Sequence, residues 1–445
     1  MERLWKLVVP AYIFLCLLLG GSAAQGTWAN AVLQLFAVLL IASAALCHKA
    51  AAQSGAGRQL LLLAAFTVGV ILLHMLPLPP GVWTLMPGSD WLESGYAALG
   101  YAQPWRPLSV TPHQTLQAAY TLLSPLAVIA AILRLGTTNE RMIAGAIVLG
   151  ALANICLAVL QLGGGGRLEW TYLYSITNTG AVGFFANRNH MASLLVAAIP
   201  FSAALFVSRA AAVSAASKSL GIAGVGGGAF ALLLIGLLLN SSMAAIALSI
   251  PTIAFSAFLL PVRTRWRNFL VPAAALAAAI SVVMLASPVR SELLKSDAAI
   301  HSRAEIWDAT TSLIARTVPV GTGIGSFPQV YASGENPRMV DRTYVNHAHN
   351  DYLELVLELG LPGLLLLLAF LVWWTRQVIR VWRTRSSSQF AKAATIASAA
   401  ILAHSLVDYP LRMTAIAALF GACLALLLPS GQRRSRDQAH HVIIG

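Results

Sequence analysis

The chain has 445 residues, of which 58% are hydrophobic and only 10% are charged. Soluble domains carry about 25% charged residues, so this composition excludes an ordinary soluble enzyme and predicts an integral membrane protein. The net charge of +13 raises the alternative of a nucleic-acid partner, but the basic residues are spread over one set of short loops, as membrane topology requires.

Apolar stretches of roughly 20 residues, the length that crosses a bilayer, recur along nearly the whole chain. We therefore expect an all-α, polytopic membrane protein with about 12 transmembrane helices, in which residues 1–445 form a single domain. The expected spans are centred near residues 15, 39, 68, 126, 151, 199, 229, 251, 277, 368, 399 and 420.

The first expected span lies in "MERLWKLVVPAYIFLCLLLGGSAAQG", which also has the basic start, apolar core and small residues of a signal peptide. An uncleaved first span is favoured, because more spans follow. The cysteines Cys16, Cys47, Cys156 and Cys423 all fall in expected spans. No disulfide framework is therefore expected between the external loops.

The basic residues indicate an orientation. If the amino terminus is cytoplasmic and the spans alternate, the cytoplasmic segments hold 19 of the 29 Lys and Arg residues but only three acids. Enrichment of Lys and Arg beside the spans on one side is the positive-inside pattern. Both termini are therefore expected in the cytoplasm, and the lipid bilayer rather than a nucleic acid is the expected partner of the basic residues.

Polar residues collect in three expected external loops, at about 78–116, 163–189 and 287–349. The first is rich in proline and tryptophan, which suits an ordered cover at the membrane interface. The third, residues 287–349, is the longest. Long loops are commonly functional or disordered, and we expect this one to be a periplasmic loop that carries short helices.

The third loop contains a helix-start pattern. Ser302 and Glu305 form an S-x-x-E capping box, and Pro319 with Gly321 ends the predicted helix. Arg303 then lies in the first turn, where free backbone N–H groups favour an anion and a guanidinium can bind a phosphate with two hydrogen bonds. A surface arginine on a loop helix is the alternative. The following "GTGIGSF" is interpreted as turn glycines rather than a phosphate cradle, because no strand precedes it.

The third loop leads into "VNHAHNDYLELVLELGLPG", residues 345–363. Asp351, Glu354 and Glu358 are spaced i, i+3 and i+7, so they share one face of the helix that begins here. On the entry turns of a membrane helix they are expected to face a wet cavity or to pair with basic groups. Asn350 is positioned to cap this helix.

His347 and His349 precede this helix and can point into the same space. A metal site is one interpretation, although no third ligand is fixed by the spacing, and a structural cluster that caps the helix is another. The third is a general base, in which a neutral imidazole takes a proton from a hydroxyl while a carboxylate orients the ring. We expect neither a metal nor another cofactor.

Three segments, "GFFANRNHMASLL", "SRAEIWDATTSLIARTVPVGTGIGSF" and "HAHNDYLELVLELGLPG", resemble the signature of the O-antigen ligase/polymerase superfamily of bacterial inner-membrane glycosyltransferases. The resemblance implies a bundle of helices and a metal-independent enzyme. It also implies transfer of a glycan from undecaprenyl diphosphate to an acceptor hydroxyl at the periplasmic face of the inner membrane.

The same resemblance implies roles for particular residues. His349 matches the essential histidine of the superfamily, and Arg303 matches an arginine that is thought to hold the diphosphate. Many members carry a Ser-Arg pair at the outer end of a middle span, where this chain reads "NSSMAAIAL" with Met243 after Ser242. Arg188, in "NRNH", is the candidate substitute for the missing arginine.

His347 and Asp351 are expected to orient His349 or to contact sugar, with Asn350 and Glu354 in support. The acceptor is lipid A-core in a ligase, another lipid-linked repeat unit in a polymerase, and a protein in a third group. Because the Ser-Arg position is altered, a polymerase of O-antigen or exopolysaccharide is slightly favoured over a ligase. A membrane carrier of small anions or lipid-linked sugars is the non-enzymatic alternative.

Overall fold

The computed structural model describes residues 2–24, 26–46, 54–135, 139–164, 169–175, 181–210, 216–260, 303–335 and 344–429. Within these ranges the regular structure is almost entirely helical, as the composition predicts. The α-helices are α1 (Glu2–Leu19), α2 (Trp28–Leu46), α3 (Gly55–His74), α4 (Pro80–Trp83), α5 (Asp90–Leu99), α6 (Pro112–Thr121), α7 (Leu123–Leu135), α8 (Glu140–Gly163), α9 (Arg188–Ala210), α10 (Ala216–Asn240), α11 (Met243–Ser256), α14 (Phe327–Gly334), α15 (Asp351–Arg383), α16 (Gln389–His404) and α17 (Thr414–Leu426).

The other regular elements are short. Residues 303–317 are also helical, where the sequence predicts the helix that carries Arg303, and Ser302 of the expected capping box lies outside the described residues. The strand β1 (Pro77–Leu78) pairs antiparallel with β2 (Arg106–Pro107). The 3₁₀ turns are η1 (Glu169–Thr171), η2 (Ala257–Leu259) and η3 (Pro410–Arg412).

In the described part of the chain, six helical segments are long and apolar enough to cross a membrane. They are Trp28–Leu46, Gly55–His74, Pro112–Leu133, Glu140–Gly163, Arg188–Arg209 and Asp351–Arg383. The expected span centres near residues 15, 229, 251, 399 and 420 fall in α1, α10, α11, α16 and α17, and the centre near residue 277 lies outside the described residues. The total of about twelve spans stays a prediction.

Helix α9 is the centre of the bundle and packs against α8, α10, α11 and α16. Its side chains Met191, Leu195 and Ile199 are fully buried. The facing helix α16 is rich in alanine, "QFAKAATIASAAILAH", and small residues let membrane helices approach closely. The same core continues through α17, which packs against α7, α16 and α1.

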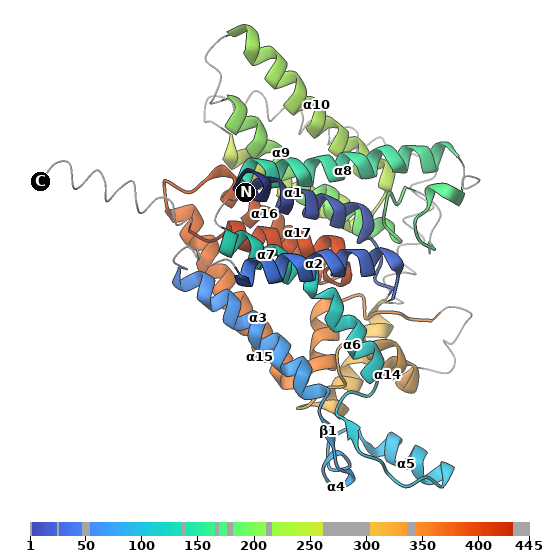
Figure 1. The fold of residues 1–445 in the computed structure, drawn as a ribbon. Coiled ribbons are helices and arrows are strands. Elements are labelled where there is room, and N and C mark those ends of the chain that lie inside the picture. Colours follow the sequence, from blue (N-terminus) through green and yellow to red (C-terminus); the bar gives the residue numbers. More distant parts are fainter. Residues whose placement is uncertain are drawn as a thin grey trace, which may run out of the picture.

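Helix α15 packs against α3, and the pair runs obliquely beside the stack of α1, α2 and α8 (Figure 1). The backbone of α15 breaks at Gly360, with φ 61° and ψ −145°, two residues before Pro362. No side chain fits at this position, because a Cβ on Gly360 would lie 2.3 Å from the carbonyl oxygen of Pro319. The kink divides α15 into an acidic entry segment and a long apolar segment, as a Gly-x-Pro sequence permits.

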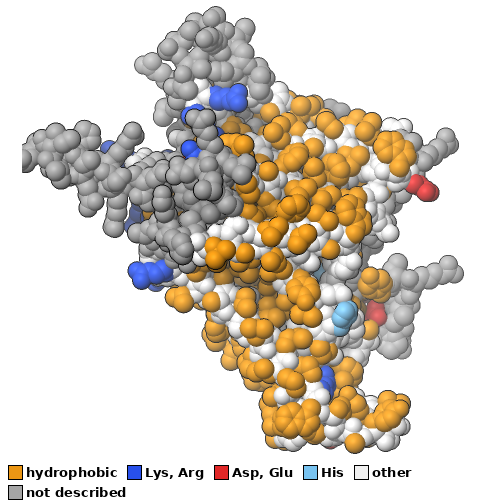
Figure 2. Space-filling view, viewed as in Figure 1, with side chains coloured by type: hydrophobic (Ala, Val, Ile, Leu, Met, Phe, Trp, Pro, Cys, Tyr) orange, Lys and Arg blue, Asp and Glu red, His pale blue; other side chains and the backbone are white. Residues whose placement is uncertain are grey.

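Residues at the external ends of the expected spans, or in the expected external loops, meet at one end of the bundle. The Ala415 N–H donates to the carbonyl of Gly20 (2.9 Å), and the Ala186 N–H donates to that of Gly21 (2.9 Å). Hydrophobic side chains cover the body of the molecule between its ends (Figure 2). In that view the Asp and Glu side chains lie at the right edge and most Lys and Arg side chains towards the left. This is the asymmetry that the positive-inside pattern predicts, while the side of the membrane stays a prediction.

Candidate active site

His349 pairs with an aspartate that lies far along the chain. Its Nδ1 lies 3.2 Å from Oδ1 of Asp408, in the connection between α16 and α17. The His349 side chain is 23% exposed, whereas that of Asp408 is 1% exposed. His349 also has a positive φ of 50°, which is uncommon for a residue other than glycine and is found at functional sites. The imidazole is therefore fixed on one side and reachable on the other.

Asp408 is held by groups from three directions. Asn189 Nδ2, in the first turn of α9, donates to Oδ2 at 2.7 Å, and the Tyr409 N–H donates to Oδ1 at 3.0 Å. The imidazole of His190 lies 3.7 Å away. Burial raises the pKa of the Asp408 carboxyl, but the imidazoles of His190 and His349 outweigh it and hold the pKa well below its ordinary value. Asp408 is therefore ionised and oriented.

The position of the expected Ser-Arg pair adjoins this site. Ser242 Oγ donates to Oδ1 of Asn189 (2.9 Å), and the amide of Asn240 donates to the backbone carbonyl of Arg188 (2.9 Å). Met243, which stands where many members have arginine, begins α11. Arg188 therefore starts α9 beside the altered position, which keeps it as the candidate substitute.

Arg303 lies on the helix of residues 303–317, which packs against the histidine segment. One turn after Arg303, the indole of Trp307 donates to the carbonyl of Ala348, between the two histidines, at 2.9 Å. Residues four apart share a helix face, so Arg303 lies on the face that contacts this segment. Its charge also acts on the buried imidazole of His404, which ends α16.

Helix α15 begins as the sequence predicts. The side chain of Asn350 accepts hydrogen bonds from the N–H groups of Tyr352 (3.0 Å) and Leu353 (3.1 Å), so Asn350 is the N-cap. Its own amide donates to the carbonyl of Leu406 at 3.0 Å. The cap therefore also ties the start of α15 to the connection that carries Asp408.

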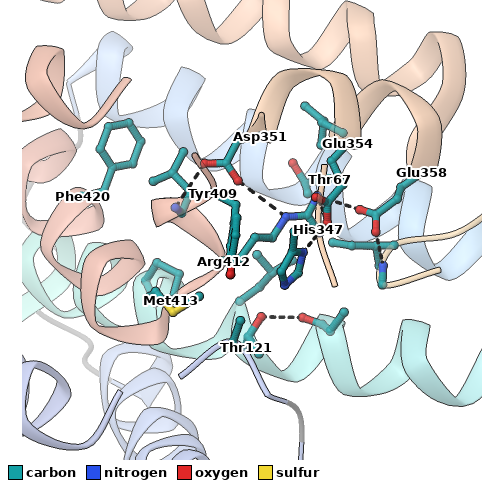
Figure 3. A pocket seen from close by; sticks show the side chains of 18 of the residues that line it. Thr67, Thr121, His347, Asp351, Glu354, Glu358, Tyr409, Arg412, Met413 and Phe420 are labelled. Carbon is teal, nitrogen blue, oxygen red and sulfur yellow. Dashed lines mark hydrogen bonds and ion pairs between the residues drawn. The ribbon is translucent and has the colours of Figure 1, made fainter. Parts of the chain in front are cut away.

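The three carboxylates of α15 converge on one arginine that the sequence did not single out (Figure 3). Arg412 lies 2.8 Å from Glu358, 3.5 Å from Glu354 and 3.7 Å from Asp351. Burial lowers the pKa of Arg412, but the three carboxylates raise it by more, so the guanidinium is charged. The prediction that these acids share a face and pair with a basic group is confirmed.

Asp351 does not orient His349. Its Oδ2 accepts hydrogen bonds from Ser405 Oγ (2.8 Å) and from the Leu411 N–H (3.2 Å). The reason is geometric, because Asp351 points along the helix face towards Arg412, and the ring of His349 faces Asp408. The carboxylate that orients the proposed base is thus Asp408.

His347 is oriented by Glu354, with 2.7 Å between Nδ1 and Oε1. The other carboxylate oxygen of Glu354 accepts the N–H of Ala348 (2.9 Å). The ring of Tyr409 joins the two histidines, since its centroid lies 4.1 Å from that of His347 and 5.0 Å from that of His349. The two histidines therefore have separate carboxylates and one shared aromatic neighbour.

The "GTGIGSF" segment forms the turn that the sequence predicts and lies against the kink of α15. Gly321, Gly323 and Gly325 all have positive φ values between 83° and 95°. The Gly325 N–H donates to Oε1 of Glu358 at 2.7 Å, and the Gly323 N–H donates to the carbonyl of the same residue at 2.8 Å. These amides bind the side chain and the backbone carbonyl of Glu358, which agrees with turn glycines rather than a phosphate cradle.

A cavity of about 770 Å³ opens beside the Arg412 cluster. Its lining includes His347, His190, Tyr409 and Arg412, together with apolar side chains of α3, α7, α15 and α17. Within the described residues, no three His, Cys, Asp or Glu side chains are arranged to hold a metal ion. Metal independence itself stays a prediction.

The sequence did not identify Asp408, His190, Asn189 and Arg412 as site residues. The sequence signal for these residues was weak, because Asp408 and Arg412 appear only as two charges in a short external turn, "LVDYPLR". Asn189 and His190 lie within "NRNH", where only Arg188 was singled out. Their partners become visible only when the ends of α9, α15 and α17 are brought together.

The fold and the site together define a helical membrane protein in which a part-exposed histidine is oriented by a buried carboxylate at one end of the bundle. Residues 228–368 match the family model described as O-antigen ligase. This match confirms the resemblance and assigns the segment from α10 to the middle of α15 to the O-antigen ligase/polymerase superfamily. No curated protein matches the chain. The family suggests a membrane enzyme of the glycosyltransferase type that acts on lipid-linked glycans in O-antigen assembly.

Proposed function

We propose that the protein transfers a glycan from an undecaprenyl-diphosphate-linked donor to an acceptor hydroxyl at the periplasmic face of the bacterial inner membrane. The observation that carries this proposal is the His349–Asp408 pair, with 3.2 Å between Nδ1 and the carboxylate. A hydrogen bond from Nδ1–H to Asp408 leaves Nε2 as the proton acceptor. A part-exposed imidazole in this tautomer is suited to act as a general base.

In the proposed reaction the acceptor O–H gives its proton to Nε2 of His349. The acceptor oxygen forms a new bond to the anomeric carbon, and the bond from that carbon to the diphosphate oxygen breaks. The lipid diphosphate leaves with the bonding electron pair. Asp408 stabilises the imidazolium that results, because its carboxylate is ionised and 3.2 Å from the ring.

Fixed cations contribute most to catalysis where they stabilise the negative charge that develops on the leaving group. Arg303 is the proposed diphosphate ligand, because it shares a helix face with Trp307, whose indole contacts Ala348 beside His349. Arg188 is the proposed second ligand, because its backbone adjoins the position that Met243 occupies. No metal or other cofactor enters this reaction.

We favour a polymerase of O-antigen or exopolysaccharide slightly over a ligase to lipid A-core. Met243 in place of the arginine of the Ser-Arg pair is the observation behind this preference. His347 and Asp351 belong to the neighbouring Arg412 cluster, and their proposed role is to contact sugar.

The test is glycan transfer by the purified protein in proteoliposomes with a lipid diphosphate donor. His349→Ala should lower the transfer rate by about 10²–10⁴-fold, the usual cost of removing a general base, and should leave donor binding intact. His113→Ala is the matched control, because His113 is exposed on α6. Near-normal transfer by His349→Ala would show that the cluster is structural.

A further inference from the structure

Ser242 stands at the start of α11 but its side chain does not cap that helix. Serine is favoured at an N-cap because its side-chain oxygen accepts a backbone N–H of the same helix. Ser242 makes no such bond, and its hydroxyl instead donates to Oδ1 of Asn189 at 2.9 Å. Ser242 is only 1% exposed. The hydroxyl is therefore directed at α9 rather than at its own helix.

The turn between α10 and α11 holds Ser242 in this direction. Ser241, directly before it, has a positive φ of 57°, which is uncommon for a residue other than glycine and is found at functional sites. The amide of Asn240 donates to the carbonyls of Ala181 (2.8 Å) and Arg188 (2.9 Å). The turn is thus fastened to the segment that leads into α9, and Ser242 lies against the first turn of that helix.

Asn189 connects Ser242 to the carboxylate of Asp408. Its Nδ2 donates to Oδ2 of Asp408 at 2.7 Å, while its Oδ1 accepts the Ser242 hydroxyl. An ionised carboxylate only accepts hydrogen bonds, so the NH₂ group of the amide must face Asp408 and its oxygen must face Ser242. The backbone N–H of Asn189 donates to Oδ1 of Asn187 at 2.9 Å. The amide therefore has one orientation, which the Ser242 hydroxyl stabilises.

Asn189 and His349 contact different oxygens of Asp408. Oδ2 accepts the Asn189 amide, whereas Oδ1 lies 3.2 Å from Nδ1 of His349. Oδ1 also accepts the Tyr409 N–H at 3.0 Å and lies 3.7 Å from Nε2 of His190. Because each oxygen is held, the carboxylate cannot rotate without breaking hydrogen bonds. This orientation favours the tautomer of His349 that is protonated at Nδ1 and leaves Nε2 to accept a proton.

We propose that Ser242 and Asn189 are positioning residues for the proposed base. They act through Asp408, whose fixed carboxylate sets the tautomer and the direction of the His349 imidazole. Ser242, which remains at the altered Ser-Arg position, thereby has a role that requires no arginine beside it. The effect on glycan transfer rests on the proposed function, while the effect on the His349 tautomer does not.

The first measurement is of the tautomer itself. Full-length protein in nanodiscs, with isotope-labelled histidine, is observed by solid-state NMR at mildly alkaline pH, where imidazoles are generally neutral. The signals of His349 are identified by their loss in His349→Ala. The unaltered protein should be protonated at Nδ1, and Ser242→Ala and Asn189→Leu should each give a mixture of the two tautomers. An unchanged single tautomer in both variants would overturn the proposal.

The second measurement is of transfer kinetics in proteoliposomes. Ser242→Ala removes one neutral hydrogen bond and should lower kcat by about two- to tenfold. Asn189→Leu removes the bond to the charged Asp408, while leucine fills the space that water could otherwise occupy, and should lower kcat by about 10–100-fold. In Ser242→Ala the KM for the lipid diphosphate donor should stay unchanged. A raised donor KM with unchanged kcat would contradict a role in positioning the base.

Ser249→Ala is the matched control for Ser242→Ala. Ser249 also lies on α11 and is 2% exposed, and its hydroxyl donates to the carbonyl of Ile246 within the helix at 2.7 Å. The two substitutions remove the same atom from the same helix, but Ser249 does not contact Asn189. Ser249→Ala should therefore change neither the tautomer nor kcat. Equal effects of the two variants would show that only the packing of α11 matters.

The His349→Ala background separates this inference from the proposed function. Ser242→Ala should have no further effect on the residual rate of His349→Ala, because the base that it positions is absent. A further loss of rate would mean that Ser242 acts by another route. If His349→Ala transfers glycan at a normal rate, the proposed function fails, and the tautomer measurement still decides whether Ser242 and Asn189 position the imidazole.

Discussion

Asp408 lies between the imidazoles of His349 and His190, and of these two rings only His349 reaches solvent, at 23% against 1% exposure. A carboxylate in this position can act on catalysis only through the exposed ring. Its other contacts, with Asn189 and the Tyr409 N–H, fix the carboxylate itself. The proposed chemistry therefore depends on the His349–Asp408 pair rather than on one histidine.

If His349 and Asp408 act as a pair, the effects of substituting them on the transfer rate should not be additive. Asp408→Asn keeps the side-chain shape but removes the charge that stabilises the imidazolium, so the transfer rate should fall while donor binding is retained. The double variant His349→Ala/Asp408→Asn should be no slower than His349→Ala alone, since residues that act as a unit are strongly non-additive. Asp308→Asn, at an exposed site, is the control. Additive losses would mean that Asp408 acts independently of His349.

Arg303 should behave differently from His349. Arg303→Ala should weaken donor binding as well as rate, because it removes the proposed diphosphate ligand. Arg303→Lys should restore binding only partly, because an ammonium cannot make the bidentate contact. Donor binding is measured with labelled lipid diphosphate in nanodiscs. Arg316→Lys, exposed on the same helix, is the control, and full rescue by Arg303→Lys would argue against a bidentate phosphate contact.

Whether the sequence could predict a site residue depends on how far away its partners are. The Asn350 cap and the acidic face of α15 are local patterns, set within three to seven residues, and both are confirmed. The partner of His349 is 59 residues away, and Asn189 is 219 residues from Asp408. No rule of sequence spacing connects such distant positions. Asp408 could therefore be identified as the partner of His349 only from the folded structure.

At the scale of elements, the helices could be predicted from local sequence, whereas their irregularities could not. The helix of residues 303–317 and the apolar helices follow from periodicity and composition. The break of α15 at Gly360 follows from tertiary packing, because the turn at Pro319 closes on it from elsewhere in the chain. The match of Arg412 to three carboxylates likewise depends on how α17 meets α15.

The segment between α3 and α6 forms a small lobe, made of β1, α4, α5 and β2, which lies below the bundle in the view of Figure 1. Its core is Trp83, whose indole donates to the Pro104 carbonyl (3.0 Å) and whose ring lies under Arg106. Its exposed side chains include five large apolar or aromatic ones, namely Leu85, Trp91, Leu99, Tyr101 and Trp105. Trp and Tyr are enriched at membrane interfaces, as the sequence predicts for this cover.

We expect the lobe to lie in the interface of the outer leaflet. Spin labels at Leu85→Cys and Leu99→Cys, in a chain without its native cysteines, should collide more with oxygen than with a water-soluble nickel chelate. Leu85 is 80% exposed and Leu99 is 70% exposed, so labels there should not disturb packing. Arg385→Cys, at an exposed position after α15, gives the water-accessible reference. Equal nickel accessibility at all three positions would place the lobe in water.

At the scale of the whole molecule, the alternating topology and the site support each other. The ends of α1 and α16 and the starts of α9, α15 and α17 meet at one end of the bundle, and the predicted topology assigns all of them to the same side. If one span had been wrongly added or omitted, the alternation would have assigned some of these helix ends to the opposite side of the membrane. The Lys and Arg residues after α15 lie in the segment assigned to the other side, which is the cytoplasm by the positive-inside pattern.

This arrangement predicts which cysteines react from outside intact cells. Trp170 lies in the second expected external loop and is 76% exposed, and Arg385 is exposed in the segment that follows α15. With the native cysteines replaced, Trp170→Cys should react with an impermeant maleimide once the outer membrane is opened. Arg385→Cys should react only after the inner membrane is permeabilised. The reverse pattern would put the histidine–aspartate pair on the cytoplasmic side, where the proposed periplasmic transfer cannot occur.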